Sequence, residues 1–175
     1  MTPHRMGELL HLRIGGFHFI EGRLDIGQEQ AVPVINRTLE YLDEHFGETD
    51  ITTILDSPPG TACPVVAATK DTDFVILVTE PTPFGLHDLT LAVDVMRDLE
   101  RDIAVVINRD GIGNDDVLAF CKNSSIPVIA RIPNDRRIAE LYSRGELIFS
   151  KVPEVRRELE KVKKAIHERT TRVVV

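Results

Sequence analysis

The sequence predicts an α/β protein with a doubly wound, largely parallel sheet that follows an N-terminal β-hairpin. Two short segments, FVILVT at 74–79 and IAVVI at 103–107, are apolar throughout. Parallel strands that are covered on both faces have this composition. Segments with apolar residues at helical spacing separate these runs from one another. Repeated strand and helix units predict right-handed crossovers, and therefore a parallel sheet with helices on its faces.

The first 70 residues contain the hairpin and three further elements. Two apolar–polar alternations flank Gly15-Gly16, which is the pattern of two antiparallel strands joined by a tight turn. Gly47 follows a segment of helical spacing, at the position where a helix terminator is expected. The expected elements are a hairpin over 9–14 and 17–24, a helix over 28–46, a strand over 50–56 and a short helix over 63–70.

The rest of the chain alternates regularly between strands and helices. Asn114 can cap one helix, and Asn134 or Asp135 can cap the next, because their side chains accept hydrogen bonds from free backbone N–H groups. Pro153 suits the first position of a terminal helix. The expected strands are 74–79, 103–107 and 126–132, and the expected helices are 86–99, 114–120, 135–144 and 153–166.

Composition excludes several classes of function. Acidic residues (28) outnumber basic ones (21), so no nucleic-acid footprint is indicated. No apolar run approaches the ~20 residues of a membrane-spanning helix, and no signal peptide is visible. Cys63 and Cys121 lie far apart, which indicates neither a disulfide framework nor a cysteine metal site. We therefore expect a single domain over 1–175 in a reduced, cytoplasmic setting.

The segment Thr52–Val66, TTILDSPPGTACPVV, carries the first candidate site. A buried strand here would deliver Asp56 to the carboxyl edge of the sheet, where open α/β sheets bind ligands. The element resembles the Walker B strand of nucleotide hydrolases, whose carboxylate holds Mg²⁺ through water. Pro58 and Pro59 stiffen the turn, and Gly60 permits close approach of an anion. Strand, acid and turn also occur together in α/β proteins that bind nothing there.

Polar residues at the ends of two later strands form a second candidate. Asn108 follows IAVVI, and its amide can pair with the edge of a purine, although an ordinary turn residue explains it equally well. Pro133 and Asp135 follow the next strand and could flank the same base. Helix capping is the simpler role for Asp135. Glu80 and Thr82 occupy the loop after the strand at 74–79.

These motifs together resemble a known family. The ordered segments LDSPPGTACPVV, VTEPTPFGLHDL, VVINRD and ARIPNDRRIAEL are similar to the second half of the MinD/ParA group of deviant P-loop ATPases. The similarity is greatest to the subgroup with an inserted ferredoxin-like domain, which FIEGRLDIGQE also resembles, and it covers residues 19–168. The resemblance implies an Mg-ATP site with three parts. These are Asp56 as the Mg²⁺-side carboxylate, Pro58, Pro59 and Gly60 as the γ-phosphate switch, and Asn108, Pro133 and Asp135 around the adenine. Arg109, next to Asn108, is a further nucleotide-binding candidate.

The chain departs from that family in one essential part. It contains no GxxxxGK[ST] run, and Gly15-Gly16 is followed by Phe17 and His18 instead of a lysine. The cysteines that would ligate an iron–sulfur cluster are also absent, so no cluster is expected. The fold is therefore expected to be of P-loop NTPase type without the P-loop strand. In the family that strand lies between those at 51–56 and 74–79, which we expect here to pair directly.

Three functions stay open. The chain could be the C-terminal part of an ATPase that is inactive alone and needs a phosphate loop from another polypeptide. The resemblance makes a polypeptide that also carries the ferredoxin domain a candidate for that partner. It could instead be a degenerate, non-catalytic module that binds a protein or regulates one. A Rossmann-type cofactor binder is disfavoured because Gly111-Ile112-Gly113 lacks the third glycine of GxGxxG. Apolar surface left by a missing half favours a homo-oligomer.

The six histidines show no metal-binding pattern on a helix. None forms an i, i+4 pair or an HxH motif, so each is expected to be structural or solvent-facing. His11 and His18 come closest to a ligand pair, because they are predicted to lie on facing strands of the hairpin.

Overall fold

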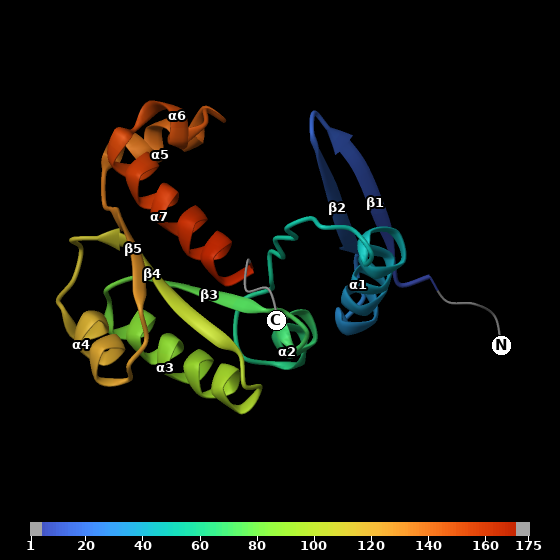
Figure 1. The fold of residues 1–175 in the computed structure, drawn as a ribbon, viewed down its shortest axis with the longest axis horizontal. Helices are drawn as coiled ribbons and strands as arrows, with labels where there is room; N and C mark the ends of the chain where they lie inside the picture. Colours follow the sequence, from blue (N-terminus) through green and yellow to red (C-terminus); the bar gives the residue numbers. More distant parts are fainter. Residues whose placement is uncertain (1–4, 171–175) are drawn as a thin grey trace. The chain divides into compact units, whose positions relative to one another are not determined.

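The structure is a computed structural model that describes residues 5–170. Its residues fall into two compact units, 1–71 and 72–175, which are described separately below (Figure 1). That the two units form the single domain expected from the sequence stays a prediction.

The first unit is built on the predicted hairpin. Strands β1 (Gly7–Ile14) and β2 (Phe17–Leu24) pair antiparallel, with Ile14 opposite Phe17. Gly15 has a φ of +59°, the left-handed conformation that a two-residue hairpin turn requires. Helix α1 (Val32–Phe46) packs on one face so closely that a Cβ at Gly22 would lie 2.4 Å from the Thr38 hydroxyl oxygen. Successive side chains of a strand point to opposite faces, so one face of the hairpin is directed toward α1 and the other away from it.

Helix α1 begins four residues later than the sequence predicts. The backbone N–H of Gln28 donates to the Asp25 carbonyl at 3.1 Å, so the chain is still turning after β2 at that point. Pro33 occupies the first turn of α1, where its missing N–H costs no intrahelical hydrogen bond. Helix α1 therefore begins beside Pro33, and it does not extend back to residue 28 as the apolar spacing predicted.

The predicted strand over 50–56 is wrong, and so is its predicted pairing with 74–79. Residues 51–62 lie in no helix or strand, and the side chains of Ile51 and Ile54 are 52% and 79% exposed. A strand needs a neighbour for its backbone N–H and C=O groups, and no described strand pairs with this segment. The short helix that follows, α2 (Cys63–Thr69), forms as predicted.

The second unit contains the predicted parallel sheet. Its three strands, in the order β3-β4-β5, run parallel. They are β3 (Phe74–Thr79), β4 (Asp102–Asp110) and β5 (Val128–Pro133). The helices between and after them are α3 (Pro83–Asp98), α4 (Asp116–Asn123), α5 (Arg136–Ser143), α6 (Ile148–Lys151) and α7 (Pro153–Thr170). The predicted α/β class and the N-terminal hairpin are both confirmed.

Helices cover both faces of this sheet. Figure 1 shows α3 and α4 on one face and α7 on the other. The central strand β4 is buried from Ile103 to Ile107, as its uninterrupted apolar sequence predicts. Val93 and Met96 of α3 and Val155 of α7 are among the buried residues of the covering helices. The loops that follow the three strands all start at the carboxyl edge of the sheet.

Two predicted helix caps have different outcomes. The Asp135 carboxylate accepts a hydrogen bond from the Arg137 N–H at 2.8 Å and caps α5, as expected. Asn114 accepts from the Asp116 N–H at 3.2 Å, but Asp115 occupies the capping position of α4. Within residues 5–170, no helix is long and apolar enough to span a membrane.

Candidate functional site

The predicted base-side residues lie at the carboxyl edge of the parallel sheet. Asp110 of β4 stands opposite Pro133 of β5, and its carbonyl accepts a hydrogen bond from the Asn134 N–H at 2.9 Å. Asn108 is half-buried, and its amide has no hydrogen-bond partner among the described residues. Because both strands end here, Asn108 and Pro133 are brought to one edge of the sheet.

Asn108 belongs to a strand, not to the turn that the sequence predicts. Strand β4 continues three residues past Ile107, and the register passes from Ile107 opposite Arg131 to Asp110 opposite Pro133. Two residues of β4 therefore face one residue of β5, which is a β-bulge. Arg109, at the bulge, has a φ of +52°. Bulges of this kind bend a strand and re-aim its side chains beside binding sites.

Arg109 contacts the loop that follows the neighbouring strand. Its guanidinium lies 3.5 Å from the Glu80 carboxylate, with 55% and 39% of the two side chains exposed. Exposed pairs of this kind contribute little stability, so Arg109 is free to exchange Glu80 for another anion. Sequence reasoning missed this contact, because an arginine rarely adopts a positive φ and no glycine marks the position.

The carboxylate of Asp135 is already engaged. The Arg137 side chain and the Arg137 backbone N–H both donate to it. The Arg137 side chain is the larger of these two influences, and together they lower the pKa of the Asp135 carboxyl. Asp135 therefore caps α5. Both of its carboxylate oxygens already accept hydrogen bonds from Arg137, so a base could bind Asp135 only by sharing an oxygen with Arg137.

The predicted metal-side residues belong to the other unit. Asp56 is exposed in the irregular segment 51–62, with Pro58, Pro59 and Gly60 beside it. Gly60 has a φ of +98° and open space where a Cβ would stand. The Asp56 carboxylate has no partner in the described chain, and one carboxylate with water is a donor set that suits Mg²⁺. No cluster of three or more metal-ligating side chains occurs within residues 5–170.

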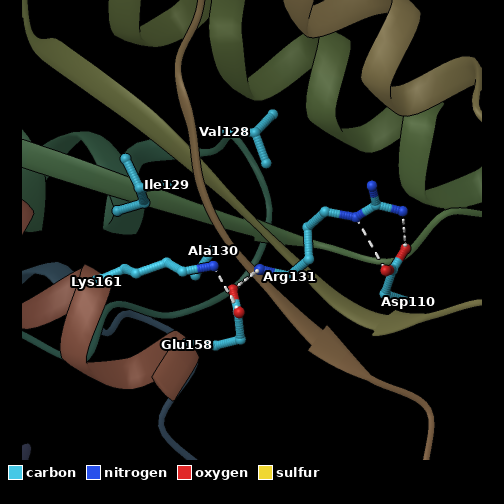
Figure 2. A pocket seen from close by; sticks show the side chains of 7 residues that line it. All are labelled: Asp110, Val128, Ile129, Ala130, Arg131, Glu158 and Lys161. Atoms are coloured by element: carbon cyan, nitrogen blue, oxygen red, sulfur yellow. Dashed lines mark hydrogen bonds and ion pairs between the residues drawn. The ribbon is translucent and has the colours of Figure 1, made fainter. Parts of the chain in front are cut away.

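The parallel sheet also carries a surface hollow of about 440 Å³ beside β5 and α7 (Figure 2). Arg131 donates two hydrogen bonds to Asp110, at 2.9 and 2.8 Å. Glu158 accepts from the Arg131 N–H at 2.9 Å and from Lys161 at 2.6 Å. None of the predicted nucleotide residues lines this hollow. Its four charged groups are paired with one another, so it offers no unpaired charge to a ligand.

Sequence comparison finds relatives without an assigned role. No protein-family model matches the chain. The uncharacterized protein MJ0579 of Methanocaldococcus jannaschii is 30% identical over 157 residues, which is 90% of this chain and 54% of the relative. The uncharacterized protein MJ0578 of the same organism is 27% identical over 155 residues, covering 86% and 52%. The chain spans about half the length of these relatives.

Comparison of structures decides the fold. The MinD cell division protein of Aquifex aeolicus matches with a TM-score of 0.61 and 19% identity, over 82% of this chain and 63% of that one. The chain has a MinD-like fold. The Aquifex aeolicus MinC:MinD complex gives 0.61 with 18% identity, covering 77% and 58%. The Pyrococcus furiosus cell division ATPase MinD gives 0.58 with 21% identity, covering 75% and 57%.

These matches confirm the P-loop NTPase-like fold that the motifs predict. The subgroup with a ferredoxin insertion, and the interpretation of this MinD-like chain as half of an ATPase, stay predictions.

Proposed function

We propose that this MinD-like chain is the C-terminal part of an Mg-ATP-binding ATPase, and that another polypeptide supplies its phosphate loop. The observation that carries the proposal is the amide of Asn108, which lies at the carboxyl edge of the sheet beside the β4 bulge and has no hydrogen-bond partner within residues 5–170. Ligands of open α/β sheets bind at this edge. An amide there offers both a donor and an acceptor to an adenine.

Each end of the nucleotide has its own residues in this proposal. Asn108 and Pro133 hold the base, one by hydrogen bonds and the other by apolar contact. Arg109 leaves Glu80 to approach the nucleotide, and Asp56 holds Mg²⁺ through water. Mg-ATP itself would supply the phosphoryl group and the metal charge. The donor set fits the metal and the base, but the chain has no glycine-rich loop for the phosphates, so we derive no hydrolysis step from this chain alone.

The open edge of β3 supports a contribution from another polypeptide. β3 pairs only with β4 among the described strands, and its sequence FVILVT contains no charge or proline that would block a further strand. Unpaired N–H and C=O groups of an apolar strand favour a partner strand. A strand carrying the phosphate loop would satisfy them at the side of the sheet next to the Glu80 loop.

A second candidate is a non-catalytic module that binds a protein. The hairpin face directed away from α1 carries four apolar side chains that are 43 to 67% exposed: Leu12, Ile14, Phe17 and Phe19. Apolar groups gathered on one strand face mark interaction surfaces more often than isolated ones do. One similar structure is a complex of MinD with MinC, and by analogy this chain could bind a protein or a second copy of itself.

Reconstitution separates the two candidates. The purified chain is mixed with a polypeptide that carries a glycine-rich phosphate loop and is encoded beside its gene, and ATP turnover is measured. The ATPase proposal predicts turnover only in the mixture, with loss in Asp56→Ala and Asn108→Ala and none in Asp94→Ala, a change on the exposed surface of α3. Tight binding of the two polypeptides with no turnover would favour the non-catalytic module.

A further inference from the structure

Two histidines of the hairpin point their ring nitrogens at each other. His11 Nε2 and His18 Nδ1 lie 2.8 Å apart. In the strand register His11 is opposite Ile20 and His18 is opposite Arg13, so the two rings are diagonal neighbours on the face toward α1. At this distance a single proton lies between two nitrogens, each of which has a lone pair when that proton is removed.

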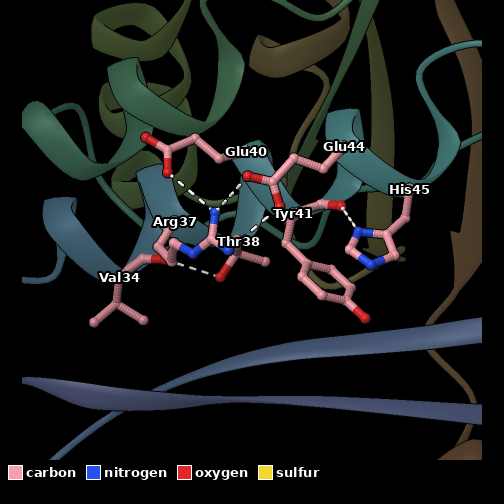
Figure 3. A network of polar contacts seen from close by, with 7 residues as sticks. All are labelled: Val34, Arg37, Thr38, Glu40, Tyr41, Glu44 and His45. Carbon is pink, nitrogen blue, oxygen red and sulfur yellow. Dashed lines mark hydrogen bonds and ion pairs between the residues drawn. The ribbon is translucent and has the colours of Figure 1, made fainter.

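Helix α1 fixes the orientation of the first ring. His11 Nδ1 lies 2.9 Å from the Tyr41 hydroxyl, and Figure 3 shows the Tyr41 side chain extending from α1 toward the hairpin. The Phe46 ring packs against both imidazoles, with centroids 5.9 Å from His11 and 4.8 Å from His18. When His11 Nδ1–H donates to Tyr41, the lone pair of Nε2 faces His18. Metal-binding histidines are usually held in this way by a hydrogen bond from their second nitrogen.

We propose that His11 and His18 form a two-histidine site for a divalent transition metal, in which two metal–nitrogen bonds replace the hydrogen bond between the rings. His18 binds as the other tautomer: its Nδ1 proton is released to solvent, and Nε2, on an exposed side chain, takes up a proton from solvent. Water completes the coordination shell, since no third metal-ligating side chain is clustered with the pair in the described chain.

The preferred ligand angles of the candidate ions differ. Bonds of about 2.0–2.1 Å from metal to imidazole nitrogen place neighbouring ligands about 2.9 Å apart at a right angle and about 3.4 Å apart in a tetrahedron. The observed 2.8 Å is a hydrogen-bond distance, and a metal bound by both nitrogens would lie beside the line that joins them, so both rings must turn toward it. Once they have turned, the right angle needs the smaller change in nitrogen separation. Square-planar nitrogen ligands are typical of Cu(II) and Ni(II), whereas Zn²⁺ prefers the tetrahedron. Cu(II) is therefore the ion that we test first, and Zn²⁺ requires the rings to separate further.

One nearby charge opposes the metal. Arg13 is the direct cross-strand partner of His18 and lies on the same face of the hairpin. A guanidinium beside a divalent cation weakens its binding, because like charges repel. Arg13→Ala is therefore expected to strengthen metal binding. A loss of structure would instead weaken it, so this variant separates the two effects.

Copper titration of the untagged full-length chain tests this site. The His4→Ala background removes a competing histidine near the N-terminus. We expect one Cu(II) per chain, with two nitrogen ligands in the electron paramagnetic resonance spectrum, and at least tenfold weaker binding in His18→Ala. His87→Ala, a change of an exposed histidine on α3, should leave the affinity unchanged.

A second variant separates the metal site from simple folding effects. Tyr41→Phe keeps the ring but removes the hydroxyl that orients His11, and is expected to weaken Cu(II) binding about tenfold. Circular dichroism verifies that each variant is folded. Equal Cu(II) affinity in the background chain and in folded His18→Ala would overturn the proposal, as would a spectrum with a single nitrogen ligand.

Discussion

The backbone N–H of Arg131 on β5 donates to the Glu158 carboxylate of α7 at 2.9 Å. A side chain thus occupies a position where a further strand would hydrogen-bond, so this edge of the sheet is partly closed. On β3, at the opposite edge, Val78 is 66% exposed and the strand pairs only with β4 in the described chain. The two edges therefore differ, and sheet extension is expected at β3.

Removing the cap of β5 should destabilise the second unit. Only 17% of the Glu158 side chain is exposed, and it accepts hydrogen bonds from Arg131 and Lys161. We expect Glu158→Ala to lower the free energy of unfolding by about 0.5–1.5 kcal/mol, because the exposed Arg131 N–H and Lys161 both lose their acceptor. Urea unfolding measures the loss. Glu160→Ala, on the exposed side of α7, should change stability by less than about 0.5 kcal/mol.

The same carboxyl should make stability depend on pH. Burial raises the pKa of Glu158, but the hydrogen bonds from Lys161 and from the Arg131 N–H outweigh it, so the pKa falls below its usual 4.5. A lowered pKa in the folded state gives stability that is complete above the unfolded value and is lost as pH falls through the folded value. The advantage of the wild type over Glu158→Gln should therefore narrow below pH 4.5. A gap that stays constant down to lower pH contradicts this.

The open edge predicts how the chain associates. Placing a charge on the exposed apolar strand β3 should block strand addition there. Val78→Lys is expected to increase the monomer fraction in light scattering at high protein concentration. Leu91→Lys introduces the same charge at a 43% exposed apolar position on α3, and should leave association unchanged. If both variants associate as the wild type does, β3 is not the contact.

The loops at the carboxyl edge are held by a glycine. A Cβ at Gly113 would lie 1.5 Å from the Pro81 carbonyl oxygen, which belongs to the backbone and cannot rotate away. Gly113→Ala is expected to cost about 1–3 kcal/mol of stability in urea unfolding, the range of overpacked sites. Gly16→Ala is the control, because nothing lies within 4 Å of its added Cβ and its φ is not in the left-handed region. Equal stability of the two variants would show that the Pro81 loop moves freely.

Sequence alone predicted the second unit more accurately than the first. FVILVT and IAVVI are strands because each is apolar throughout and lies in a sheet that covers both faces. The run at 50–56, DITTILD, mixes three apolar residues with polar ones, and no described strand pairs with it. Composition describes the side chains of a strand and carries no information about whether a partner backbone is present.

The candidate site was predictable in its residues but not in its geometry. Asn108 and Pro133 could be placed at the carboxyl edge because parallel strands end together there. The bulge at Arg109 could not, since no glycine marks the positive φ. The ion pair of Arg131 with Asp110 also gave no sequence signal, because the residues are 21 positions apart and depend on the shifted register.

The most direct test of the nucleotide-site account is an amide-resolved NMR titration of the ¹⁵N-labelled chain with Mg-ATP and, separately, with adenosine. The account predicts weak binding of both, with chemical-shift changes centred on residues 108–110 and 134–135 and lost in Asn108→Ala. Adenosine should reproduce the changes, because the base rim acts without the phosphates. Shifts confined to other parts of the chain, or an Asn108→Ala variant that binds as the wild type does, would contradict the account.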